Sequence, residues 1–204
     1  MFSTAFRRHA VVAAALAVWL PTVAYGMSVL WRYSTTPGHP ASPPVTWPLR
    51  ISTERKPGMA TLLMFAHPQC GCSKASLGEL AIIMAHAHET VSAIVFFYVP
   101  RNQPLSWAHT DLWDTAKTIP GITAIEDTEN DFASRFGAFT SGQTLVYDSH
   151  GRLIFNGGIT ASRGHSGDSY GRDAIIALLQ NHDAPPADLP IISPVFGCSL
   201  RSEE

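Results

Sequence analysis

The sequence predicts an α/β domain with a central sheet flanked by helices, preceded by an apolar N-terminal segment. Three observations support this prediction. Strand-like and helix-like stretches alternate along most of the chain, an uncharged stretch follows a basic start, and two cysteines lie where the first strand gives way to the first helix of the domain.

The N-terminal segment, residues 1–33, has the pattern of a signal anchor or transmembrane helix. Two arginines come first, and the uncharged stretch Ala10–Leu30 would span roughly 31 Å as a helix, about the thickness of a bilayer core. The arginines favour a cytoplasmic N-terminus. We therefore expect a single pass through a bacterial inner (cytoplasmic) membrane, with the rest of the chain facing the periplasm or exterior. The small residues Ala24 and Gly26 leave a cleaved signal peptide open.

Three further regions follow the apolar segment. Residues 34–48 are rich in proline and lack a hydrophobic period, which predicts an extended linker that holds the domain off the membrane. Residues 49–183 form the predicted domain. Residues 184–204 form a C-terminal tail that carries Cys198, and its apolar residues predict that it lies back across the domain.

Each element of the domain is predicted from its residue pattern. Short apolar or β-branched runs bounded by proline and glycine predict strands at 61–67, 91–99 and 122–127, and a hairpin of 143–147 and 152–156 with its turn at 148–151. Apolar residues at helical spacing predict helices at 73–88, 109–119, 129–137 and 171–182.

Composition limits the classes of function. A net charge of −2 and 46% hydrophobic residues disfavour both a nucleic-acid-binding surface and a disordered chain. Three cysteines are too few for a disulfide-stabilised scaffold, so we interpret them as chemically active.

The stretch His-Pro-Gln-Cys-Gly-Cys-Ser-Lys contains the main candidate site. Cys70 and Cys72 precede or begin a predicted helix, and Lys74 adds a positive charge nearby. The positive end of a helix lowers the pKa of a cysteine and makes it a better nucleophile. We therefore expect an accessible thiolate at Cys70. Gly71 gives the backbone freedom for a Cys70–Cys72 disulfide, which would be strained and labile.

Cys198 is the third candidate. The functional interpretation is that the tail brings it to Cys70 and Cys72, where it resolves a mixed disulfide or completes a metal site. The alternative is a buried or free cysteine without a role.

The loop 157–173 also has two interpretations: Arg163, His165 and Asp168 either line the site or are solvated.

The order of elements, with cysteines at the first strand-to-helix junction, resembles the thioredoxin fold, and in particular the membrane-anchored, TlpA-like thiol oxidoreductases. Phe65 and Cys70 match that family's strand phenylalanine and nucleophilic cysteine, whereas Ser73 stands at the family's second cysteine and Lys74 at its basic residue. A smaller RedB-like subgroup is similar in its Cys-x-Cys, its Gly-Gly-Ile-Thr and its terminal Phe-Gly-Cys, here 196–198.

The chain departs from the family's pattern at two supporting positions. Gln69 replaces the tryptophan that precedes the first cysteine in the family. Where thioredoxin-like proteins place a cis-proline, this sequence has Ser141 and Gly142. Because a cis bond without proline is costly, we expect trans geometry there.

The resemblance implies a membrane-anchored, extracytoplasmic thiol–disulfide oxidoreductase without a cofactor. Cys70 would attack a partner's disulfide, and Cys72 or Cys198 would resolve it. The partners would be protein thiols or disulfides, or an upstream electron-donor protein, and the membrane through residues 10–30, but no nucleic acid. One alternative is a copper- or zinc-binding protein or metallochaperone that uses Cys70, Cys72, Cys198 and His67. Another is a redox-inactive scaffold.

Overall fold

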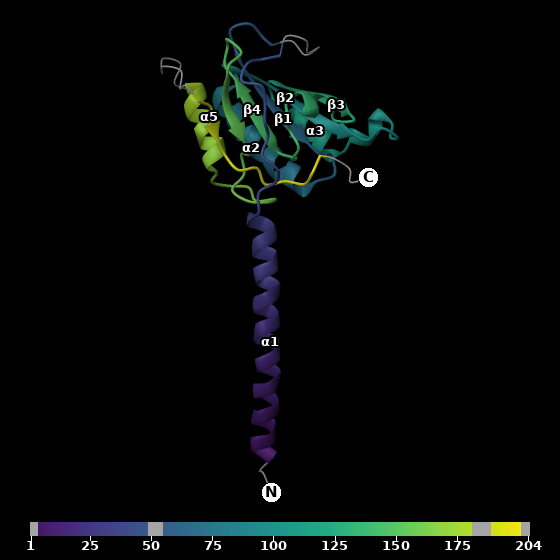
Figure 1. Cartoon of the computed structure of the whole chain (residues 1–204), viewed down its shortest axis with the longest axis vertical. Coiled ribbons are helices and arrows are strands. Elements are labelled where there is room, and N and C mark those ends of the chain that lie inside the picture. Colours follow the sequence, from purple (N-terminus) through teal and green to yellow (C-terminus); the bar gives the residue numbers. More distant parts are fainter. Residues whose placement is uncertain (1–3, 49–54, 181–188, 201–204) are drawn as a thin grey trace. The chain divides into compact units, whose positions relative to one another are not determined.

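The computed structural model describes residues 4–48, 55–180 and 189–200, which belong to two compact units divided after Thr36. The first unit contains the helix α1, Thr4–Thr35, with Pro21 inside it (Figure 1). Its stretch Phe6–Thr35 is long and apolar enough to cross a membrane, with a mean hydropathy of 1.8. This is the helix that the sequence predicts.

The second unit is built on a six-stranded mixed sheet in the order β3-β2-β1-β4-β5-β6. Strands β1, β2 and β3 run parallel to one another, β4 is antiparallel to β1 and to β5, and β6 is parallel to β5. The strands are β1 (Ala60–Ala66), β2 (Val91–Val99), β3 (Ile122–Thr128), β4 (Gln143–Tyr147), β5 (Leu153–Gly157) and β6 (Ile191–Ile192).

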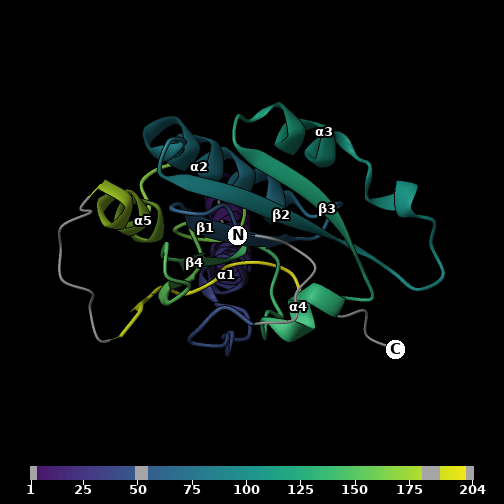
Figure 2. The same ribbon diagram turned by 90° about the horizontal axis from the view of Figure 1, so that it is seen from above.

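Helices cover both faces of this sheet. Figure 2 shows α2, α3 and α5 on one side and α4 on the other. The helical elements are α2 (Gly71–Ala87), the 3-10 helix η1 (Leu105–Ala108), α3 (Asp111–Thr118), α4 (Asp131–Arg135) and α5 (Tyr170–Gln180). A parallel β-α-β unit followed by an antiparallel hairpin and a helix is the thioredoxin-like arrangement, which confirms the predicted fold class.

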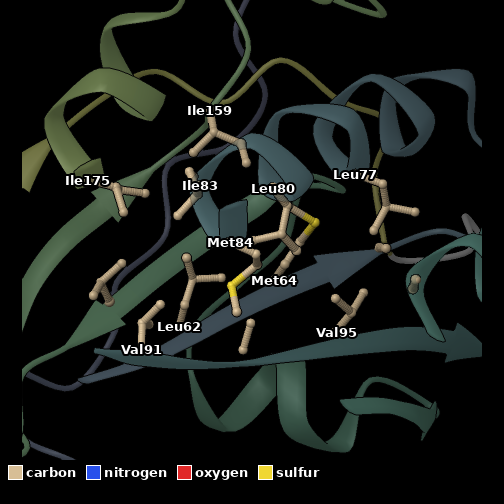
Figure 3. Close-up of a cluster of buried hydrophobic side chains, with 14 of the residues drawn as sticks. Leu62, Met64, Leu77, Leu80, Ile83, Met84, Val91, Val95, Ile159 and Ile175 are labelled. Atoms are coloured by element: carbon tan, nitrogen blue, oxygen red, sulfur yellow. The ribbon is translucent and has the colours of Figure 1, made fainter. Parts of the chain in front are cut away.

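Two hydrophobic clusters hold the layers together, because side chains alternate between the faces of a strand. In β1, Leu62 and Met64 point to the α2 side, and Leu63 and Phe65 to the α4 side. Figure 3 shows the first cluster, where side chains of α2 meet those of the strands. This packing fixes the C-terminal end of β1 and the start of α2, the junction that carries the cysteine pair.

Most predicted elements agree with the observed ones to within a few residues. The predicted helix at 109–119 differs: η1 ends at Ala108, and α3 begins only after Thr110, its N-cap. The end of the last predicted helix, residues 181–182, lies outside the described residues. The strand β6 was not predicted, because its two residues carry no periodic signal.

The proline-rich segment is extended, as expected, but it lies against the domain from Pro37 to Pro48 instead of forming a free spacer. Its backbone and that of the domain exchange hydrogen bonds, and Trp47 packs edge-on against Tyr147. The bonds are Ser42 N–H to Gly137 O, Trp47 N–H to Gly151 O, Leu153 N–H to Val45 O and Tyr147 O–H to Pro44 O.

The C-terminal tail crosses the domain, as predicted. It enters as β6 beside β5, then continues to Leu200, which is 2% exposed. The yellow ribbon in Figure 1 follows this course. A bridge between Thr140 and Ser199 pairs this part of the tail with the segment before β4, and Cys198 lies beside the cysteine pair.

Candidate functional site: a three-thiol cluster

Three cysteines converge at the N-terminus of α2. Cys70 is the N-cap residue, Cys72 lies in the first turn, and Cys198 comes from the tail. All three sulfur atoms lie within 4.8 Å of one another, and the Sγ atoms of Cys70 and Cys198 are 2.9 Å apart. The tail therefore brings a third thiol to the pair, although it is 128 residues from Cys70 in sequence.

The strand-to-helix junction positions Cys70. After β1, the chain turns at His67 and Pro68, and the Cys70 N–H donates to the His67 carbonyl at 3.1 Å. Cys70 itself is extended, and its carbonyl accepts the N–H of Ser73, which starts the helix. Its side chain thus sits at the N-terminus of the helix, where the partial positive charge of the helix stabilises a thiolate.

Backbone pairing positions Cys198. The Ser141 N–H donates to the Cys198 carbonyl at 2.8 Å, and the Leu200 N–H donates to the Phe139 carbonyl at 2.9 Å. Gly197 approaches so closely that a Cβ there would lie 1.8 Å from the Ser141 oxygen. Only glycine fits at this position, so the close approach of the tail requires the glycine that precedes Cys198.

The expectation that Cys70 is readily accessible is wrong. Cys70 is 6% exposed and Cys72 is 9% exposed, whereas Cys198 is of intermediate exposure. The physical reason is the tail: it lies in contact with the Cys70 sulfur and pairs with the neighbouring backbone. The tail therefore lies against the Cys70 sulfur.

The environment of Cys70 favours its thiolate. Burial raises the pKa of Cys70, but hydrogen bonds from the Cys198 thiol and from the backbone N–H groups of Ser73, Cys72 and Cys198 outweigh it, and the net pKa is lowered. The donors belong to the helix N-terminus and to the tail. Lys74, the expected additional cation, is exposed to solvent.

The other two thiols have raised pKa values. For Cys72 the causes are burial, then the charge and hydrogen bond of Cys70. Burial and the same interactions with Cys70 raise the pKa of Cys198 to about 12. The positive charge of Arg163 acts in the opposite direction on both. Of the three thiols, Cys70 therefore loses its proton most readily, and Cys72 and Cys198 hold theirs more tightly.

A loop after β5 connects this cluster to a buried ion pair. Arg163 donates a hydrogen bond to the Gly197 carbonyl, next to Cys198. The loop is held by Glu79 of α2, which is 1% exposed, accepts the Gly167 N–H at 2.7 Å and pairs with Arg172 at 2.8 Å. Of the three loop residues singled out from sequence, His165 and Asp168 are exposed, and Arg163 is at the site.

Sequence reasoning missed Glu79. The signal available was its position: Glu79 lies one residue before Leu80 and three after Ser76, both buried on the inner face of α2. An acidic residue on a buried helix face requires a partner. The partner, Arg172, is 93 residues further along the chain, so the sequence alone does not identify it.

Ser73 and Ser141 form a buried polar link beneath the cluster. Their hydroxyl oxygens are 2.7 Å apart, the His67 N–H donates to the Ser141 hydroxyl at 3.0 Å, and the Ser73 hydroxyl donates to the His67 carbonyl. Ser73 thus ties the start of α2 to the turn before β4.

The structure does not place His67 among the thiols. The metal-binding alternative that combined His67 with the three cysteines is therefore reduced to the three cysteines. Its Nδ1 accepts the Gln69 N–H at 3.2 Å, and its ring packs against Tyr98 and Trp107. Burial lowers the pKa of His67, which favours the neutral form of the ring. Within the described part of the chain, the only grouping of possible metal ligands is the three cysteines.

The residues in place of the cis-proline have trans geometry, as expected, since no cis peptide bond occurs in the described residues. Gly142 adopts a φ of +87°, and its N–H donates to the Phe65 carbonyl at 2.7 Å. This turn presents the Ser141 N–H to the tail.

Comparisons with known proteins agree with the fold. No protein-family model matches the sequence, and neither does any curated protein. Among solved structures, an uncharacterized conserved protein from Geobacillus kaustophilus matches with 18% identity and a TM-score of 0.59, over 83% of this chain and 93% of that one.

A hypothetical protein from Sinorhizobium meliloti matches with 20% identity and a TM-score of 0.51, over 82% of this chain and 94% of that one. A secreted disulfide oxidoreductase from Mycobacterium tuberculosis matches with 14% identity and a TM-score of 0.42, over 61% and 82%. At these identities the likeness concerns the fold alone.

Proposed function

We propose that this chain is a membrane-anchored, extracytoplasmic thiol–disulfide oxidoreductase of the TlpA-like, RedB-like type, with Cys70 and Cys198 as its redox couple. The observation that carries the proposal is the 2.9 Å contact between the two Sγ atoms at the start of α2. A stabilised thiolate in contact with a second thiol is the arrangement that disulfide exchange requires.

The chemistry is a two-electron exchange. In the oxidised protein, Cys70 and Cys198 share a disulfide; in the reduced protein they are a thiolate and a thiol. A partner dithiol that passes through a mixed disulfide gives up two electrons and two protons and leaves as a disulfide, and the reverse reaction reduces a partner. The partners are protein thiols or disulfides, or an upstream electron donor, and no cofactor takes part.

The proposed location follows from the N-terminal unit. Phe6–Thr35 is apolar enough to span a membrane, and Arg7 and Arg8 precede the apolar stretch. Positive residues favour the cytoplasmic side, so the domain would lie in the periplasm or its equivalent. A disulfide-exchanging site suits that oxidising compartment.

The test is disulfide mapping combined with an activity assay. The full-length protein in detergent is equilibrated with glutathione buffers, and its cysteine linkages are identified by mass spectrometry. We expect a Cys70–Cys198 disulfide and reduction of insulin disulfides. Cys70→Ser and Cys198→Ser should each abolish that disulfide, while Ser149→Ala, an exposed turn residue, should not change it. Full insulin reduction by Cys70→Ser would refute the proposal.

One observation supports a second candidate function, the binding of copper(I) or zinc. Three thiols within 4.8 Å form a soft donor set. Two sulfurs bound tetrahedrally to one zinc lie about 3.8 Å apart, however, so the 2.9 Å contact between Cys70 and Cys198 would have to lengthen. Elemental analysis after anaerobic purification tests this candidate: the absence of copper and zinc would eliminate it.

A further inference from the structure

The two sulfurs of the redox couple differ in how an incoming group reaches them. Cys70 is 6% exposed and begins a helix whose inner face packs on the sheet. Cys198 is more exposed, and it lies in a surface segment next to the exposed Ser199. In a Cys70–Cys198 disulfide, a partner thiolate would therefore meet the Cys198 sulfur first.

The two sulfurs also differ as leaving groups. Cys70 is the N-cap residue of α2, so the partial positive charge at the helix N-terminus stabilises negative charge on its sulfur. Burial and the charge of Cys70 raise the pKa of Cys198. Since the thiol with the lower pKa leaves faster, a disulfide attacked at Cys198 breaks more readily than one attacked at Cys70.

From these two differences we propose that the partner's sulfur bonds to Cys198, on the tail, and that Cys70 is an internal thiolate that bonds only to Cys198. This inference rests on the proposed function. In this scheme the tail forms the surface that meets the partner. The N-terminus of α2 stabilises the thiolate that forms on Cys70 when its bond to Cys198 breaks.

The exchange balances as follows. A partner thiolate attacks Cys198 Sγ, the Cys198–Cys70 bond breaks, and Cys70 leaves with the electron pair. The partner's second thiolate then attacks the partner's own sulfur in its mixed disulfide with Cys198, and the bond between that sulfur and Cys198 breaks. The partner leaves as a disulfide, and Cys198 is released as a thiolate that takes up a proton. Reduction of a partner follows the same steps in reverse.

The contacts of the tail fit this role. Arg163 donates to the Gly197 carbonyl and places a positive charge near Cys198, where it stabilises the thiolate that departs in the second step. Once Cys70 is bonded to Cys198, its charge is gone, and so is one of the causes that raise the pKa of Cys198. The backbone pairing through Ser141 keeps Cys198 in reach of Cys70 during the exchange.

The test uses the full-length oxidised protein and reduced glutathione as the probe. A brief reaction with limiting glutathione is quenched in acid, free thiols are alkylated, and the glutathione adduct is located by mass spectrometry. We expect the first adduct on Cys198, in roughly tenfold or greater excess over Cys70. Ser149→Ala, on the exposed turn before β5, is the control and should give the same distribution.

Two results would overturn the inference alone. The first is a first-formed adduct on Cys70, and the second is loss of the Cys198 adduct in Cys72→Ser, which would mean that exchange passes through Cys72. Failure of the proposed function is a different result, in which the wild-type protein forms no Cys70–Cys198 disulfide at any glutathione ratio.

Discussion

Replacing Gly197 by alanine should separate Cys198 from Cys70 without touching either sulfur. A Cβ at residue 197 would lie 1.8 Å from the Ser141 oxygen and 2.8 Å from its carbonyl carbon. Both atoms belong to the backbone of the turn before β4, so a side-chain rotation cannot relieve the clash. The tail has to move away from this turn.

The magnitude follows from the bonds that hold the tail there. Displacement breaks two backbone hydrogen bonds, Ser141 N–H to Cys198 O and Leu200 N–H to Phe139 O. At about 1 kcal/mol each, their loss lowers the local concentration of Cys198 at Cys70 by about 30-fold. If Leu200 also leaves its buried position, the cost rises by roughly 1.5–3 kcal/mol.

The assay is the equilibrium constant between glutathione and the Cys70–Cys198 disulfide in the full-length protein. We expect Gly197→Ala to make this disulfide about 30-fold easier to reduce. Gly78→Ala is the matched control, because the nearest atom to a Cβ there is the Ser166 hydroxyl at 3.9 Å. An unchanged equilibrium constant in folded Gly197→Ala protein would show that the tail does not hold Cys198 in place.

Three further predictions concern Arg163, the contact of Tyr147 with the proline-rich segment, and the pKa of Cys198. Arg163→Gln should make the Cys70–Cys198 disulfide roughly tenfold easier to reduce because the bond to Gly197 is lost, and Arg163→Lys should recover part of that loss. Arg101→Gln, which removes an exposed ion pair with Glu129, should have no effect in the same glutathione titration; an equal effect would contradict a specific role for Arg163. Tyr147→Phe should lower the free energy of unfolding by about 1 kcal/mol in a urea titration, since it removes the bond to Pro44; no loss would mean that residues 37–48 do not stabilise the domain. The third prediction concerns pH and the raised pKa of Cys198. A thiol whose pKa is higher in the folded than in the unfolded protein contributes stability that is lost as pH rises. The melting temperature of the reduced protein should therefore fall as pH goes from about 8.5 toward 12, and it should fall less in Cys198→Ser. Equal pH dependence in the two proteins would contradict the raised pKa of Cys198.

Local patterns were sufficient for the elements that carry the cysteine pair. The apolar run of β1 is bounded by a Pro-Gly and by Pro68, and the apolar spacing of α2 begins right after it, so the junction at Cys70 could be predicted. The two-residue strand β6 and the break between η1 and α3 could not. The strand depends on pairing with β5, and at the break the Thr110 hydroxyl donates to the distant Pro68 carbonyl.

The composition of the cluster shows a similar division. His67 matched a metal-binding pattern in sequence, yet its ring nitrogen is engaged by the Gln69 N–H, a contact set by the local turn. The sequence left the position of Cys198 open between the site and a free or buried thiol, and Glu79 was marked only as an acidic residue on a buried helix face. Their partners are distant in sequence, and such pairings arise from packing.

The sequence by itself determined that an apolar helix precedes an α/β domain and that Cys70 and Cys72 stand at the start of a helix, because strand and helix periods and helix caps are local properties of the chain. Only the tertiary structure decided that the tail pairs with the turn at Ser141, that Cys198 reaches Cys70, and that Cys70 is thereby buried. Those outcomes depend on close backbone approach at Gly197 and on contacts between segments distant in the chain, such as Cys70 and Cys198 at a separation of 128 residues, which no local pattern encodes.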